Sequence, residues 1–191
     1  MNNINIQVYS SCNCDCSFCH FKDNKCNRIN PDFVIDFLNN NLNYTKILLT
    51  GGEPTLAIKE YEKLIQGLIS PNRTLILQTN GWWGNNETIK NSIKAYPPSL
   101  VHLSVDSEKQ KHIKLETAKN AYQFLIDNNI PVCVVNHTSN QEEFNRYSKI
   151  FPNLIKGKIC IDDGINLYDC GTALLADNTI SNLNIKGWRN K

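Results

Sequence analysis

Three cysteines near the start of the chain have the spacing of an iron–sulfur ligand set. Cys12, Cys16 and Cys19 form the pattern C-x3-C-x2-C within one short segment. Iron–sulfur clusters are held by cysteine thiolates, and four is the usual number for full ligation. Three thiolates on one tight loop can therefore hold three corners of a [4Fe-4S] cluster and leave the fourth iron open to a non-protein ligand.

A fourth cysteine in the same loop leaves a second interpretation open. Cys14 completes the run C-x-C-x-C-x2-C, which could supply the four ligands of a closed, tetrahedral zinc site. A zinc site would not explain a second motif of the chain, Thr50-Gly51-Gly52-Glu53-Pro54. We therefore favour the cluster and interpret Cys14 as a thiol that is not a ligand.

Together the two motifs resemble those of the radical SAM (S-adenosylmethionine) superfamily. The resemblance rests on the cysteine spacing, on the aromatic Phe18 before the third cysteine, and on the GGEP segment. It implies that the methionyl amino and carboxylate groups of SAM bind the open iron of a [4Fe-4S] cluster held by the three cysteines. It also implies that Gly51, Gly52, Glu53 and Pro54 hold the ammonium group, and that Phe18 lies beside the adenine.

Short apolar runs alternate with helical patterns along the chain, which predicts consecutive βα units and a parallel sheet. The six predicted strands are Ile4–Tyr9, Lys46–Thr50, Thr74–Gln78, Leu100–Val105, Val132–Val135 and Lys158–Ile161. Radical SAM enzymes, which the motifs resemble, have an open barrel of six βα units. The predicted fold class is therefore α/β, an open partial (β/α)6 TIM-like barrel with a parallel sheet.

The chain length predicts one main domain with its own core. With 191 residues, the chain is long enough for one compact domain and too short for two. We expect residues 1–165 to form the partial barrel and residues 166–191 to form a short tail that packs on it or extends it. Within the barrel, Ser139 and Glu142 predict a capping box at the start of a helix.

Polar residues follow the predicted strands at the edge where βα barrels have their active sites. Ser104 and Asp106 stand where the superfamily often holds the ribose hydroxyls or the carboxylate of SAM, although Asp106 could equally cap the next helix. The further cofactor-binding residues that we predict from these strand ends are Thr79, Asn80, Ser104, Asp106 and Asn136.

Other residues have weaker indications. Cys160 and Cys170 could donate a hydrogen atom to a substrate radical, and no local C-x2-C set indicates an auxiliary cluster. The adjacent Trp82 and Trp83 could line a substrate site or pack against the next helix.

The composition is that of a soluble globular protein, with 41% hydrophobic and 20% charged residues and a net charge of +2. This charge favours neither a nucleic-acid partner nor a membrane surface. No apolar run is long enough to span a bilayer, and the first residues do not have the pattern of a signal peptide. Five of the eight cysteines lie between Cys12 and Cys26, which indicates a metal site and not a disulfide framework. We expect a cytoplasmic protein.

The resemblance implies reductive cleavage of SAM to a 5′-deoxyadenosyl radical that abstracts a hydrogen atom from a substrate. We expect an electron donor such as flavodoxin or ferredoxin and a peptide or protein substrate. Two alternatives are a small-molecule enzyme similar to 7-carboxy-7-deazaguanine synthases and a glycyl-radical-enzyme activase. The activase is disfavoured because activases carry a basic residue after the fourth strand, where this chain has Asp106. The non-enzymatic alternative is an iron–sulfur or zinc-binding module.

Overall fold

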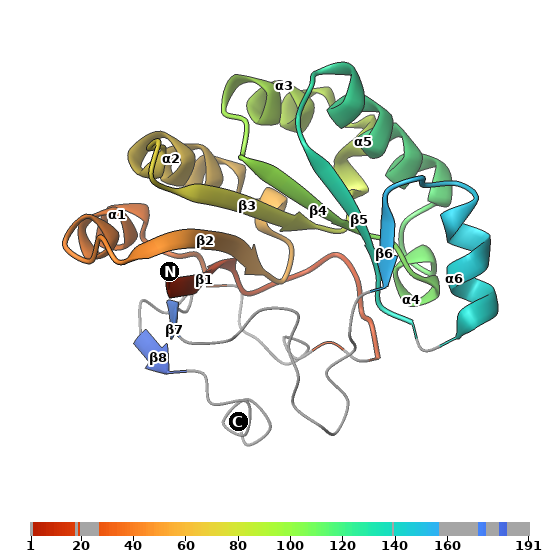
Figure 1. Ribbon diagram of the computed structural model, residues 1–191, viewed down its shortest axis with the longest axis horizontal. Coiled ribbons are helices and arrows are strands. Elements are labelled where there is room, and N and C mark those ends of the chain that lie inside the picture. Colours follow the sequence, from red (N-terminus) through yellow and green to blue (C-terminus); the bar gives the residue numbers. More distant parts are fainter. Residues whose placement is uncertain are drawn as a thin grey trace.

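The computed structural model describes residues 2–17, 19, 27–138, 140–156, 172–174 and 180–182. Its centre is a curved sheet, most of whose neighbouring strands are also neighbours in sequence (Figure 1). Six of them run parallel in the order in which they occur along the chain: β1 (Asn2–Tyr9), β2 (Tyr44–Gly51), β3 (Thr74–Thr79), β4 (Leu100–Ser104), β5 (Val132–Asn136) and β6 (Leu154–Lys156).

Two short strands extend this sheet beyond β1. Strand β7 (Thr172–Leu174) pairs parallel with the edge of β1 that β2 leaves open, and β8 (Ile180–Asn182) pairs antiparallel with β7. The sheet order is therefore β6-β5-β4-β3-β2-β1-β7-β8, with β6 and β8 at its two ends. Because the ends do not meet, the barrel is open, and the predicted partial (β/α)6 fold is confirmed.

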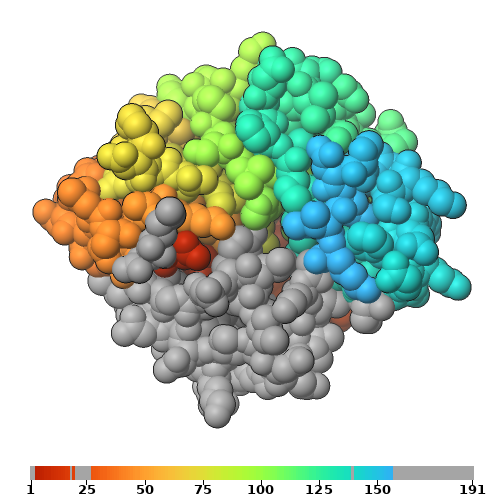
Figure 2. Space-filling view, in the orientation of Figure 1, coloured from red at the N-terminus to blue at the C-terminus, as the bar shows by residue number. Residues whose placement is uncertain are grey.

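Helices connect the strands and cover the outer side of the sheet (Figure 1). In Figure 2 the coloured surface forms an arc that runs from orange, the colour of α1, to cyan, the colour of α6. None of the helices that the structure describes is both long and apolar enough to cross a bilayer. Their bounds are α1 (Pro31–Asn39), η1 (Pro54–Ala57), α2 (Ile58–Leu68), η2 (Trp82–Asn85), α3 (Glu87–Ala95), α4 (Ser107–Gln110), α5 (Leu115–Asp127) and α6 (Gln141–Ser148).

The core lies between the sheet and these helices, and alternate strand residues point into it. In β1 the side chains that belong to this core are those of Ile4, Ile6 and Val8. The residues between them are polar and lie on the opposite, inner face of the sheet. On that face Thr50 of β2 donates a hydrogen bond to Gln78 of β3 at 3.3 Å. Strands buried in a fully apolar environment lack this alternation. The inner face of the sheet is therefore polar where it approaches the carboxyl ends of the strands.

Two local boundaries differ from the sequence prediction. Strand β6 comprises Leu154–Lys156, whereas the predicted sixth strand, Lys158–Ile161, lies outside the described residues. Helix α6 is capped by Asn140, whose side chain accepts hydrogen bonds from the backbone N–H groups of Glu142 and Glu143. The predicted cap at Ser139 was therefore wrong, because the next residue offers an amide oxygen at the position where both orphan donors can reach it.

Candidate active site

The GGEP segment and the cysteine loop are joined by backbone hydrogen bonds. The N–H of Gly52 donates to the carbonyl of Tyr9 at 2.7 Å, and the N–H of Glu53 donates to the carbonyl of Ser11 at 2.9 Å. These bonds continue the pairing of β1 with β2 beyond the end of the two strands. The start of the cysteine loop is therefore fixed to the segment that follows β2.

Both glycines of this segment are required by the closeness of that contact. A Cβ atom on Gly52 would lie 1.9 Å from the Ser11 carbonyl oxygen, and one on Gly51 would lie 2.4 Å from that of Tyr9. Gly51 also has a φ of +129°, which disfavours any other residue. The space left by the two missing side chains is thus taken up by the backbone at the end of β1 and at the start of the cysteine loop.

Glu53 lies at the centre of a buried hydrogen-bond network. Its side chain is 1% exposed. Oε1 accepts hydrogen bonds from the backbone N–H (3.2 Å) and hydroxyl (2.5 Å) of Thr55 and from the hydroxyl of Thr79 (2.8 Å), and Oε2 accepts from the N–H of Asn80 (2.8 Å). Burial raises the pKa of the Glu53 carboxyl, while these donors act in the opposite direction. The carboxylate joins the segment after β2 to the end of β3.

The two adjacent tryptophans support the same network. The indole N–H of Trp82 donates to the Thr55 hydroxyl at 2.8 Å, and that of Trp83 donates to the Thr79 hydroxyl at 3.0 Å. The Thr79 oxygen also accepts from the N–H of Gly81, so both of its lone pairs are used and its proton is directed to Glu53. Trp83 is buried and packs edge-on against Phe124 of α5, which is not the next helix that the packing alternative named.

Asn80 connects this network to the cysteine loop. Its side chain is 5% exposed. Its Nδ2 lies 2.8 Å from Asn13 Oδ1, 3.4 Å from Cys14 Sγ and 3.7 Å from Cys12 Sγ. Hydrogen bonds therefore lead from Glu53 through Asn80 to two thiols of the loop.

The thiols of the loop interact with one another. The Cys14 N–H donates to Cys12 Sγ at 3.3 Å, and Cys16 is buried. Hydrogen bonding from Cys14 lowers the pKa of both Cys12 and Cys16, and the same bonds raise the pKa of Cys14. Cys14, which we predicted not to be a ligand, is thus in contact with two predicted ligands. The N–H of Cys19 donates to the Cys16 carbonyl.

The donor set fits an iron–sulfur cluster in kind, because thiolates are its usual ligands. Among the residues that the structure describes, no three His, Cys, Asp or Glu side chains surround a common position for a metal ion.

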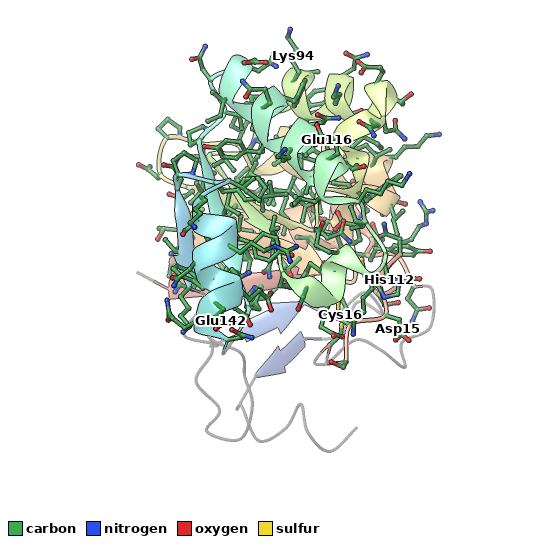
Figure 3. The ribbon with its side chains drawn as sticks, turned by 90° about the vertical axis from the view of Figure 1, so that its right-hand side faces the viewer. Asp15, Cys16, Lys94, His112, Glu116 and Glu142 are labelled. Atoms are coloured by element: carbon green, nitrogen blue, oxygen red, sulfur yellow. The ribbon has the colours of Figure 1, made fainter. Side chains whose placement is uncertain are left out.

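The segment after β4 packs on the cysteine loop from the other side. The N–H of Asp15 donates to His112 Nε2 at 3.3 Å, and the N–H of Ser17 donates to Glu108 Oε2 at 3.1 Å. Figure 3 shows Asp15, Cys16 and His112 together at one end of the molecule, with Lys94 at the opposite end. The loop is therefore held between β2, β3 and the α4 region.

Asp106 serves this segment as a helix cap. Its carboxylate accepts from the N–H of Lys109 at 2.9 Å and forms an ion pair with Lys109 Nζ at 2.6 Å, and the residue is 1% exposed. These contacts agree with the second interpretation of Asp106 from the sequence, in which it caps the next helix. Contact between Asp106 and SAM stays a prediction.

Two other predicted residues lie buried at the carboxyl ends of β4 and β5. Ser104 is 3% exposed, and the Nδ2 of Asn136 donates to the Val105 carbonyl at 2.7 Å. The Oδ1 of Asn136 is buried and has no hydrogen-bond partner among the described residues. A buried oxygen without a donor is costly, so Asn136 suits a ligand that brings one. Phe18, Cys160 and Cys170 lie outside the described residues.

Several residues of the site were not found from the sequence. Asn13, Thr55, Glu108 and His112 each make a hydrogen bond that shapes the cysteine loop or the GGEP segment. Thr55 follows the GGEP motif directly, which is a signal that could have indicated it. The others act through contacts between distant segments, and no local pattern reveals those.

Comparison with known proteins agrees with the two motifs and the fold. The model of the radical SAM superfamily matches residues 6–140. A Methanocaldococcus jannaschii protein named as a glycyl-radical enzyme activating enzyme is 27% identical over 156 residues, which are 80% of this chain and 56% of that protein.

Two solved structures have a similar fold. Native anSMEcpe with bound AdoMet and Kp18Cys peptide matches with a TM-score of 0.69 at 16% identity, over 96% of this chain and 75% of the other. Streptococcus suis SuiB bound to S-adenosylmethionine matches with a TM-score of 0.69 at 12% identity, over 88% of this chain and 44% of the other. The chain thus spans about half the length of the M. jannaschii protein and of SuiB.

The family match covers most of the chain and includes the cysteine loop, the GGEP segment and the ends of β3, β4 and β5. The recognition made from the two motifs is therefore confirmed. The chain belongs to the radical SAM superfamily, an enzyme class whose cofactors are a [4Fe-4S] cluster and S-adenosylmethionine.

Proposed function

We propose that this chain modifies a peptide or protein by radical SAM chemistry. In this class, the reduced cluster supplies the electron that cleaves SAM to a 5′-deoxyadenosyl radical, which abstracts a hydrogen atom from the substrate. Cys12, Cys16 and Cys19 are the proposed cluster ligands. An external one-electron donor such as flavodoxin or ferredoxin is the proposed reductant.

The observation that carries the choice of substrate comes from two independent routes: a relative found by sequence is named for action on an enzyme, and structures found by fold contain a bound peptide. The relative found by sequence is named as an activating enzyme of other enzymes. Among the relatives found by fold, anSMEcpe was solved with a peptide and SuiB with its precursor peptide SuiA. The polar inner face of the sheet also suits a peptide, which brings backbone donors and acceptors.

The protein's part in this chemistry is to hold the reactants in place. The Glu53 network fixes the position of the segment whose backbone carbonyls we propose to hold the SAM ammonium group. Asn136 Oδ1 offers a buried acceptor at the end of β5, and Ser104 offers a hydroxyl at the end of β4. Such preformed groups need no reorganisation when the ligand arrives.

A glycyl-radical-enzyme activase is the second candidate, and a specific contact favours it. The sequence argument against an activase was the acidic Asp106 at a place where activases carry a basic residue. In the structure, Lys109 occupies the same short segment, with its ammonium group 2.6 Å from Asp106 and its side chain 12% exposed. A basic group is therefore present after β4, and the M. jannaschii relative carries this name.

The test begins with the anaerobically reconstituted protein, dithionite and SAM. We expect about four irons per chain, from the cluster stoichiometry, and slow release of 5′-deoxyadenosine. The triple variant Cys12→Ala, Cys16→Ala, Cys19→Ala should lose both, whereas the matched Cys14→Ala variant should keep both. Loss of the cluster in Cys14→Ala alone would contradict the proposed ligand set.

The substrate is then sought among the products of neighbouring open reading frames. A change in the mass of a short peptide, dependent on SAM and on the three cysteines, is the expected result for a peptide-modifying enzyme. A glycyl-radical EPR signal in a large partner protein would instead identify an activase. SAM cleavage that is stimulated only by small metabolites would contradict both candidates.

A further inference from the structure

Asn80 is held so that only one orientation of its side-chain amide is allowed. Its backbone N–H donates to Glu53 Oε2 at 2.8 Å. Its Oδ1 accepts from the backbone N–H of Trp82 at 3.1 Å. A backbone N–H can only donate, so Oδ1 must face Trp82 and Nδ2 must face the other way. The two amide protons are thereby directed at the cysteine loop.

The partners of those two protons lie within the loop. The shorter contact, 2.8 Å, is to Asn13 Oδ1 and accounts for one proton. The other proton faces two sulfur atoms, those of Cys14 at 3.4 Å and Cys12 at 3.7 Å. Because Asn80 is 5% exposed, water competes little for these contacts.

We propose that Asn80 is a positioning residue for the cluster: it donates an N–H···S hydrogen bond to the sulfur of Cys12 and raises the reduction potential of the cluster. Hydrogen bonds to the sulfurs are among the determinants of iron–sulfur potentials. An added electron increases the negative charge on the ligand sulfurs, so an N–H donor stabilises the reduced form more than the oxidised form. The inference rests on the proposed ligation by Cys12.

The hydrogen bonds around Asn80 hold its amide in place, so that the amide can donate to the cluster without a change in its own position. Glu53 holds its backbone, and Glu53 is itself held by Thr55 and Thr79. The two threonine hydroxyls each accept from a tryptophan indole. A donor whose own supports are hydrogen-bonded keeps its geometry in both redox states.

The experiment compares Asn80→Ser with its parent in a Cys14→Ala background. Cys14→Ala removes the sulfur that lies nearer to Asn80 Nδ2. A change in the reduction potential then reports on the hydrogen bond to Cys12. A serine hydroxyl can still accept from the backbone N–H two residues on, as Asn80 Oδ1 does, but it offers no amide donor that reaches the sulfur. The matched control is Asn40→Ser, the same substitution at an exposed side-chain amide that caps the end of α1 and contacts none of the described residues of the cysteine loop.

The measurement is an EPR-monitored redox titration of the reconstituted cluster, together with iron content. With equal iron in all variants, Asn80→Ser should lower the midpoint potential. At a fixed potential, the ratio of reduced to oxidised cluster should fall severalfold, where a tenfold fall corresponds to about 59 mV for a one-electron couple. Asn40→Ser should titrate as its parent does. An unchanged midpoint in Asn80→Ser would overturn the inference.

A second measurement applies if Asn80→Ser fails to fold or to hold the cluster. Asn13 is then replaced by alanine, so that the nitrogen atoms of this second asparagine are absent. The Asn13→Ala protein is labelled with 15N-asparagine, reduced, and examined by pulsed EPR for a nitrogen coupling to the cluster. Such a coupling supports the N–H···S bond, and its absence overturns the inference. A wild-type chain that binds no iron would overturn the proposed function as well, whereas a cluster indifferent to Asn80 overturns this inference alone.

Discussion

At the scale of single residues, Glu53 has a structural role that the GGEP motif does not indicate. The sequence predicts a carboxylate that holds the SAM ammonium group. The structure shows a carboxylate that accepts four hydrogen bonds from Thr55, Thr79 and Asn80 while 1% exposed. Contact with SAM stays a prediction, but the bracing of the site by Glu53 is independent of any ligand.

Glu53→Gln should therefore destabilise the protein even without SAM. Glutamine replaces one acceptor oxygen with an NH2 group that faces a donor, and a hydrogen bond to a charged group contributes about 1.5–3 kcal/mol. We expect the unfolding free energy to fall by about that amount, measured by urea denaturation of the reconstituted protein. Glu116→Gln is the control, since its carboxylate is 71% exposed in a surface ion pair. Equal stability of Glu53→Gln and wild type would contradict the bracing role.

At the scale of elements, the backbone contact between the GGEP segment and the cysteine loop positions the site. Gly52 lies where β2 ends, and its N–H is bonded to the carbonyl of Tyr9 at the end of β1. The two loops are therefore joined, and we expect a change on the β2 side to displace the thiols.

Gly52→Ala should separate these two loops. The new Cβ would lie 1.9 Å from a backbone oxygen that cannot move alone, and overpacking of this kind costs about 1–3 kcal/mol. We expect lower stability and reduced iron content after reconstitution.

The matched control for that change is Gly67→Ala in helix α2. There the new Cβ would lie 2.3 Å from Cδ1 and 2.7 Å from Cγ1 of Ile35, so it would displace a side chain and no backbone atom, and alanine is the better helix former by about 1 kcal/mol. Gly67→Ala should keep its iron and most of its stability. Full iron content in Gly52→Ala would show that the close contact between the loops is not needed.

The elements also show which parts of the fold could be predicted from sequence. Helix α2 buries Tyr61, Leu64, Ile65 and Leu68 at helical spacing, and Asn30 caps α1 with Pro31 at its first position. Periodicity and caps are local, so a sequence indicates them, although for α6 the prediction placed the cap one residue too early. Strand β7 has three residues and depends on pairing with β1, and the contact between Glu53 and Asn80 joins two separate loops. Neither leaves a local pattern.

At the scale of the whole molecule, the polar inner face of the sheet makes stability depend on pH. Burial lowers the pKa of His102 on β4 to about 4, and the positive charge of Lys46 on β2 contributes in the same direction. The unfolded chain binds this proton near the ordinary value of about 6.5. Because the folded histidine resists protonation, its contribution to stability is present above that value and is lost as the pH falls toward 4.

His102→Gln should remove this dependence. We expect the unfolding free energy of the wild type to decline more steeply than that of His102→Gln between pH 6.5 and pH 4. The two proteins are compared by urea denaturation across this range, so that acid effects common to both cancel in the difference. Parallel curves would show that His102 is protonated as easily in the folded protein as in the unfolded chain.

The order of the strands has a consequence for synthesis of the chain on the ribosome. Strands β1 to β6 each pair with their neighbour in sequence, so this part of the sheet can form progressively as the chain emerges. The outer edge of β1 stays unpaired until β7 has been synthesised, since Ile4 pairs with Thr172. During that interval the strand that leads into the cysteine loop offers an unpaired edge to other chains. A chain cut after residue 156 would keep that edge permanently, and we expect it to aggregate although its barrel strands β1 to β6 are all present.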